Sequence, residues 1–89
     1  MLRITQSFLN EQTIVFRLDG TLTAVSCLEL EALCSQIQHS DGKIIHLDMG
    51  GVVFMNEEVA KRLVELRSNR LSIINCSPFV EMLLRAVAT

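Results

Sequence analysis

The sequence contains no tryptophan and no tyrosine, and only four of its 89 residues are phenylalanine. Stacking platforms for nucleic-acid bases and aromatic cages for cations are built from such side chains, so neither kind of site is expected. Basic residues are also few, since eight Lys and Arg stand against ten Asp and Glu and form no run. The chain therefore lacks the clustered positive charge that nucleic-acid binding normally needs.

Long apolar runs are missing as well. No stretch approaches the roughly 18 to 20 apolar residues that cross a bilayer, so no direct insertion into a membrane is expected. The first twelve residues lack the basic flank, apolar core and small-residue cleavage site of a signal peptide. A composition of 49% hydrophobic and 20% charged residues is typical of a folded globular chain. We therefore expect one cytoplasmic domain over residues 1–89.

Cysteine and histidine are too sparse and too scattered for a zinc site. The chain has Cys27, Cys34 and Cys76, without CxxC spacing, and only two histidines, His39 and His46. Cys27 and Cys34 lie seven residues apart on a predicted helix, where buried reduced thiols are expected. Neither histidine adjoins a nucleophile motif such as GxSxG, so a solvated His39 and a structural His46 are favoured. No catalytic residue, metal or cofactor is assigned.

The N-terminal half predicts a hairpin followed by a helix. Residues 3–8 and 13–18 alternate polar and apolar around a polar turn, which indicates two antiparallel strands, the second ended by Asp19-Gly20. Helical spacing of apolar residues then begins at Ser26, in a capping box with Glu29, or earlier, at Thr23. Gly42 is suited to end this helix.

The C-terminal half alternates strands and helices. Short buried strands are predicted at 43–49 and 71–75, the first followed by Gly50-Gly51 and the apolar run 52–55. Helices are predicted at 56–68 and after Ser77-Pro78, where Ser is a cap and Pro the first helical residue. The order β-β-α-β-α-β-α predicts an α/β fold in which a mostly parallel sheet with an antiparallel edge hairpin packs against helices.

The adjacent glutamates Glu57 and Glu58 mark the start of the second helix. Neighbouring helical residues diverge by about 100° and do not converge on one atom, which leaves a metal site that includes Asp48 as a minor alternative. Asn56 is a favourable N-cap, and each acid beside the positive helix end contributes roughly 0.3 to 1 kcal/mol when exposed. The residues alone therefore indicate a well-made helix start.

Three segments in order resemble the STAS domain family, which comprises anti-sigma factor antagonists and related modules. They are LDG at 18–20, HLDMGGVVFMNEEV at 46–59 and LSIINCSPFVEMLL at 71–84. The resemblance runs from about residue 4 to residue 87 and implies a sheet with helices on one side and no catalytic activity. It also implies protein partners, often a serine kinase that doubles as an anti-sigma factor, or a place in sensory and transport assemblies.

The resemblance also identifies the position of a phosphorylation switch. In switchable members the strand leads into Asp-Ser-Ser-Gly, and a serine at the helix start accepts phosphate; here the matching residues are NEEV, and Glu58 stands at the phosphoacceptor position. A carboxylate cannot accept phosphate, and it carries about −1 against roughly −1.5 to −2 for phosphoserine. The chain thus resembles either a permanently phosphorylated form or a branch without the switch. The second is favoured, because the motif's aspartate and glycine are also missing.

The main hypothesis is a non-enzymatic STAS-like module that docks onto a protein partner. The segment 56–71 is shorter than the family's by more than one helical turn, so an altered partner surface is expected. The predicted partner-binding residues are Asp48, Gly50, Asn56, Glu57, Glu58, Lys61 and Arg62. The alternatives are a module that senses a small ligand or nucleotide and a regulatory subunit of a transport complex; self-association into a homodimer also stays open.

Overall fold

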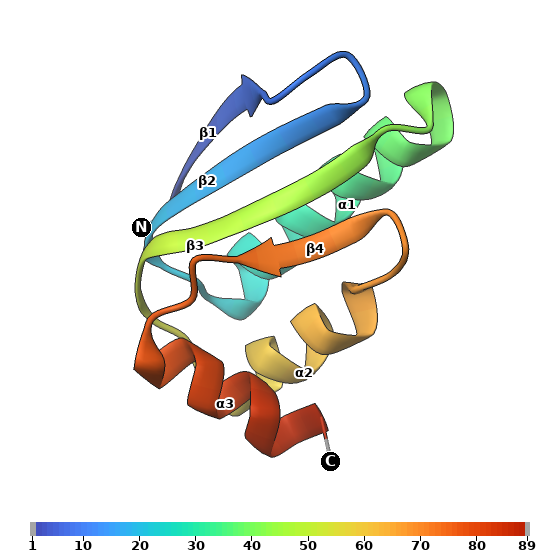
Figure 1. The fold of residues 1–89 in the computed structure, drawn as a ribbon. Coiled ribbons are helices and arrows are strands. Elements are labelled where there is room, and N and C mark those ends of the chain that lie inside the picture. The colour runs from blue at the N-terminus through green and yellow to red at the C-terminus, as the bar shows by residue number, and fades with distance from the viewer. Residues whose placement is uncertain (1, 89) are drawn as a thin grey trace.

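The computed structural model describes residues 2–88 and confirms the predicted order of elements. The elements are β1 (Leu2–Phe8), β2 (Thr13–Thr21), α1 (Ala24–Asp41), β3 (Ile44–Phe54), α2 (Glu57–Leu66), β4 (Leu71–Ile74) and α3 (Pro78–Ala88). The strands form one sheet in the order β1-β2-β3-β4, with β1 and β2 antiparallel and the other neighbours parallel. The predicted α/β fold with an antiparallel edge hairpin is therefore confirmed (Figure 1).

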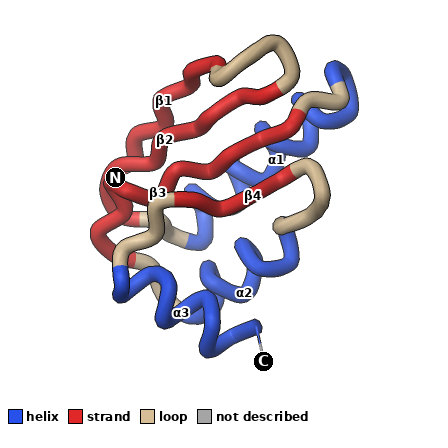
Figure 2. The backbone as a smooth tube through the Cα atoms, viewed as in Figure 1, coloured by secondary structure: helices blue, strands red, loops and turns tan. Residues whose placement is uncertain are grey.

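The helices lie on one side of the sheet, and its other face is turned toward the viewer in Figure 1 and Figure 2. Along each strand, side chains alternate between the two faces of the sheet. In β2, for example, Phe16 and Leu18 are buried toward the helices, whereas Arg17 between them is exposed. Helix α2 contacts both α1 and α3. The core that results contains Ile14, Phe16, Leu18, Leu30, Ile45, Leu47, Met49, Val59, Leu63, Val80 and Leu84.

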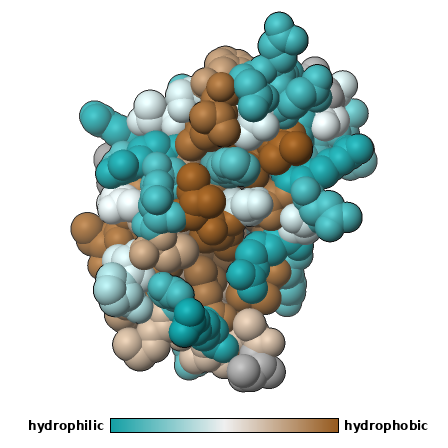
Figure 3. All heavy atoms as spheres, in the orientation of Figure 1, coloured by the Kyte–Doolittle hydropathy of each residue, from teal (hydrophilic) through white to brown (hydrophobic). Residues whose placement is uncertain are grey.

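The open face of the sheet is only partly polar. Val15 and Ile74 are half-buried there and Ile44 is 37% exposed, because no element covers them. In the space-filling view, hydrophobic side chains gather in the middle of this face and hydrophilic ones flank them (Figure 3). The one-sided arrangement thus leaves a second, thinner layer of apolar side chains in contact with water.

Strands β2 and β3 are longer than the sequence indicated. The prediction that Asp19-Gly20 ends β2 is wrong, because the strand continues to Thr21 through a shift in register between Arg17 and Asp19. Gly20 has φ 111°, a backbone conformation that favours glycine, so the strand bends here without breaking. Strand β3 likewise runs without interruption to Phe54, through both glycines that were predicted to follow it.

Caps decide where the helices begin and end. The earlier of the two possible starts of α1 is the observed one, since Thr23 Oγ1 accepts a hydrogen bond from the Ser26 N–H at 3.2 Å. Gly42 closes the helix in the left-handed conformation, and its N–H donates to the Gln38 carbonyl, as predicted. Helix α2 ends at Leu66, two residues before the predicted end, and hydrogen bonds between Ser68 and Leu71 form the tight turn into β4.

The three cysteines generate a prediction about thiol reactivity. Cys27 and Cys34 are buried, Cys76 is half-buried, and all three are free. Burial raises the pKa of the Cys34 thiol to about 11 and also raises the pKa of the Cys27 and Cys76 thiols. Because the thiolate is the reactive form, we expect slow labelling of the native chain at pH 7 that accelerates as the pH rises.

Cys76 should react first, since it is the most accessible of the three, and Cys27 and Cys34 should react only as the chain unfolds. Timed alkylation followed by peptide mass spectrometry, with and without urea, measures this order. Rapid labelling of Cys34 in the folded chain would contradict the packing of α1 against the sheet.

Candidate functional site

The end of β3 and the start of α2 form the centre of the candidate site. Asn56 is the N-cap of α2, as predicted, because its side-chain oxygen accepts a hydrogen bond from the Val59 N–H at 2.9 Å. Glu57 and Glu58 are exposed in the first turn, and neither makes an ion pair with any residue between 2 and 88. Two unpaired carboxylates therefore stand in water at the positive end of the helix.

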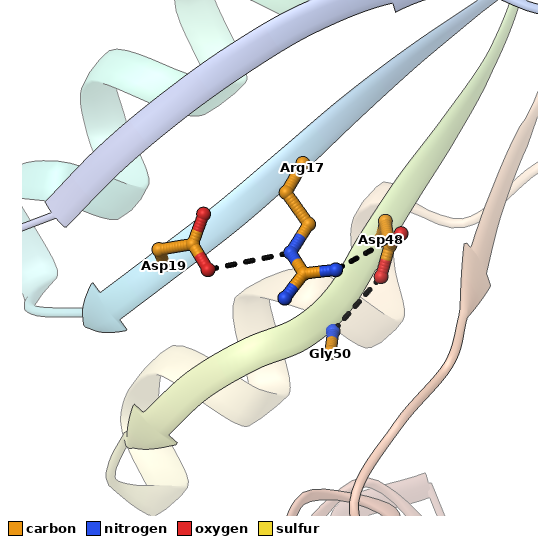
Figure 4. Close-up of polar contacts among 4 residues, drawn as sticks. All are labelled: Arg17, Asp19, Asp48 and Gly50. Atoms are coloured by element: carbon orange, nitrogen blue, oxygen red, sulfur yellow. Dashed lines mark hydrogen bonds and ion pairs between the residues drawn. The ribbon is translucent and has the colours of Figure 1, made fainter.

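Asp48 and Gly50 lie on the open face of the sheet, in a separate group. Asp48 accepts a hydrogen bond from the Gly50 N–H at 2.9 Å, and its other oxygen lies 3.9 Å from Arg17 Nη1. Arg17 also donates through Nε to Asp19 at 3.3 Å, so its guanidinium lies between two carboxylates (Figure 4). Asp48 is therefore occupied by contacts within the sheet, and about 20 Å of strand separates it from Phe54.

Lys61 and Arg62 differ in what they can offer a partner. The Arg62 guanidinium binds both carboxylate oxygens of Glu31 on α1, with Nε–Oε1 at 3.2 Å and Nη2–Oε2 at 2.9 Å. These hydrogen bonds raise the pKa of Arg62 and join α1 to α2. Lys61 is exposed and has no carboxylate partner in the described part of the chain, so it is the freer of the two cations.

Sequence reasoning missed an exposed apolar ridge, which we define as Phe54, Phe79 and Met82. The rings of Phe54 and Phe79 stack with their centroids 5.9 Å apart, although the side chains stay 53% and 42% exposed. Met82 follows Phe79 by one helical turn on α3 and is 67% exposed. Val80 and Leu84 fill the buried side of α3, so Phe79 stays on the surface, and the excess of apolar residues on α3 was the available signal.

The ridge and the two glutamates occupy the same end of the molecule. Phe54 is the last residue of β3, and Glu57 begins α2 only three positions later. The start of α3 lies at this end too, where Figure 1 shows the first turn of α3 below the ends of β3 and β4. The face formed by the ridge, Glu57 and Glu58 is called the helix-start face below.

Three further features of residues 2–88 concern metal sites, membrane spans and hollows. No three histidine, cysteine, aspartate or glutamate side chains come together there in a metal-binding group, and none of its helices is long and apolar enough to cross a membrane. A hollow of about 450 Å³ lies between β4 and α3. Its wall includes Arg67 and Arg85, of which Arg85 is paired with Glu81 at 2.6 Å.

The close pairing of β2 with β3 at Asp19 and Gly51 generates a prediction about Gly51. A Cβ at this position would clash with the Asp19 carboxylate and lie 2.8 Å from the Leu18 carbonyl oxygen. We expect Gly51→Ala to lower the free energy of unfolding by about 1 to 3 kcal/mol, because neighbouring atoms must shift. At Gly50 the nearest atom to such a Cβ is Asp48 Oδ1 at 3.1 Å, so Gly50→Ala is the matched control and should cost less. Urea denaturation of both variants tests this, and equal stabilities would contradict it.

The helix cap generates a second prediction. Asn56→Ala removes the acceptor of the Val59 N–H and should destabilise the chain by about 1 kcal/mol. Asn56→Asp keeps an oxygen at the same place and should retain most of the stability. Denaturation midpoints measure the difference, and an alanine variant as stable as the aspartate variant would show that the cap does not stabilise α2.

No protein-family model matches the sequence, and no curated protein matches it. Solved structures do. The anti-sigma factor antagonist SpoIIAA in its unphosphorylated form is similar with a TM-score of 0.72 and 18% identity, over 93% of this chain and 82% of that one. The Bacillus cell fate determinant SpoIIAA in its phosphorylated form gives a TM-score of 0.69 and 21% identity, over 94% and 82%. The chain therefore has a STAS-like fold, as the resemblance in its sequence predicted.

Proposed function

We propose that this chain is a non-enzymatic regulatory module that docks onto a protein partner through the helix-start face. The observation that carries the proposal is the juxtaposition of an exposed apolar ridge with two unpaired carboxylates. Stacked aromatic side chains that remain half in water are costly to keep on a surface and are typical of the buried centre of an interface. Phe54 and Phe79 would be covered in the complex and contribute most of the affinity.

The charges of the face define the partner's chemistry. Glu57 and Glu58 add negative charge beside the ridge, and no cation among residues 2–88 neutralises them. We propose a partner whose surface carries lysine or arginine around an apolar depression, because such complementarity sets specificity and association rate. The likeness in fold to an anti-sigma factor antagonist supports a cytoplasmic signalling protein of the anti-sigma factor or serine kinase kind.

Phosphorylation does not regulate this face in our proposal. The residues from Asn56 to Val59 contain no hydroxyl group, and Glu58 occupies the position of the phosphoacceptor in the family pattern. Ser77 lies at the start of α3, and its Oγ already caps that helix by accepting from the Val80 N–H at 3.3 Å. The negative charge of the face therefore comes from Glu57 and Glu58 and does not depend on phosphorylation of residues 56–59.

A charge reversal tests the helix-start face. The wild-type chain and a Glu57→Lys, Glu58→Lys double variant are immobilised and exposed to an extract of the native host, and each captured protein is quantified. We expect the wild type to capture the partner and the double variant to capture at least tenfold less of it. The partner's basic surface would then face the two introduced lysines, and like charges repel. Proteins captured equally by both do not count as partners.

The matched control is Glu11→Lys, Glu65→Lys, which makes the same change of charge at two exposed glutamates away from the helix start. It should recover the partner as the wild type does. Since reversal at the helix start also weakens α2, thermal melting must show that the test variant is folded, and Phe79→Ser serves as an independent probe of the ridge. Equal recovery of all proteins by the wild type and the test variant would contradict the proposal, as would phosphate on Ser77 that releases the partner.

A further inference from the structure

The two edges of the sheet differ in how well they are protected. Strand β4 has only four residues, and the N–H and C=O of Leu71 at its start already bond to Ser68. Strand β1 has seven residues with a continuous register against β2, contains no proline, no lysine and no bulge, and has Arg3 as its single charged residue. Prolines, bulges and several charges are the usual devices that prevent an edge strand from pairing with another chain, so β1 is the less protected edge.

The hairpin turn determines which residues of β1 bond to β2 and which direct their backbone N–H and C=O groups outward. The Leu9 N–H donates to the Thr13 carbonyl at 3.0 Å, which places this pair among those that exchange hydrogen bonds. In an antiparallel ladder such pairs alternate, so Ser7, Thr5 and Arg3 bond to β2. The N–H and C=O groups of the intervening residues, Leu2, Ile4, Gln6 and Phe8, therefore point away from the sheet along its free edge.

These outward groups are complementary to a second copy of themselves. When two β1 strands lie antiparallel with Thr5 facing Thr5, Leu2 comes opposite Phe8 and Ile4 comes opposite Gln6. All four are outward-pointing residues, so each of these pairs can exchange two hydrogen bonds. Arg3 comes opposite Ser7, so no like charges face each other. A contact in which the same strand supplies both sides is the isologous kind that two-fold dimers use.

The side chains at the edge also favour a second copy. Leu2, Ile4 and Phe8 project to the helix side, where Leu2 and Ile4 are half-buried and Phe8 is 64% exposed. A hollow of about 370 Å³ lies beneath this edge, lined partly by Phe8, Leu33 and Ile37. A two-fold axis perpendicular to the sheet keeps both helix layers on one side. Each Phe8 would then cover Leu2 of the second copy, and the apolar layer would continue across the axis.

We propose that β1 pairs antiparallel with β1 of a second copy, which joins two four-stranded sheets into one sheet of eight strands with Thr5 on the two-fold axis. The helix-start face of each copy stays uncovered, because it lies at the end of β3 and not along the β1 edge. The dimer therefore presents two docking faces, and this inference stands independently of what those faces bind.

Cross-linking tests the register. Residues at the non-hydrogen-bonded position on the axis have Cα atoms about 4.5 Å apart, within the range that a disulfide bridges. In a Cys76→Ser background, which removes the most accessible native thiol, Thr5→Cys should form a covalent dimer on mild oxidation. Ser7→Cys, two residues along the same face, is the matched control and should cross-link at least tenfold more slowly. Equal cross-linking of both variants would overturn the proposed register.

Mass measurement tests the edge itself. Analytical ultracentrifugation of the wild-type chain over a range of concentrations should reach twice the 10.0 kDa of one copy. Gln6→Pro removes an outward N–H without breaking a bond to β2, and Thr5→Glu places two carboxylates face to face, so both should sediment as monomers. Circular dichroism of each variant establishes that it is folded.

Three results would overturn the proposal. A wild-type chain that stays at monomer mass at all concentrations excludes self-pairing. A dimer that survives both substitutions uses another surface. A wild-type monomer that captures a different protein from the host, in a complex lost with Gln6→Pro, would assign the edge to a strand of that protein.

Discussion

The close packing of β2 against β3 at Asp19 and Gly51 is the contact on which the candidate site depends. A side chain at residue 51 would clash with the Asp19 carboxylate, so glycine lets the two strands stay paired through the shift in register that begins at Arg17. Because pairing continues, β3 reaches Phe54 and delivers the ring to the end of the sheet. Asn56 then caps α2 directly beyond it, which sets Glu57 and Glu58 beside the ridge.

Features that depend on neighbours in the sequence were predictable. The order of elements, the caps at Asn56 and Gly42 and the exposed glutamates follow from local spacing, since a cap or a helical stripe involves residues only a few positions apart. What sequence reasoning missed lies across the fold. Arg62 donates a hydrogen bond to Glu31, which lies 31 positions earlier in the sequence. Strand β2 continues beyond Asp19 because it stays paired with β3. Local patterns carry no information about such contacts.

Exposure of apolar side chains was the least predictable property of the chain. A stripe on α3 identifies side chains able to enter a core, but it does not say how many the core can hold. In this small fold Val80 and Leu84 fill the space above α2, and Phe79 is left stacked on Phe54 in water. Apolar residues on the open sheet face also remain uncovered, because the three helices cover only the other side of the sheet.

The helix start without a hydroxyl group has a consequence for how a cell could use this chain under the proposed function. A face whose charge is encoded in the polypeptide itself cannot be turned off by adding a group to residues 56–59. Occupancy of the partner then depends on how much of the chain is present relative to the dissociation constant, by mass action. Synthesis and proteolysis would be the controls, and the signal would last as long as the molecule does.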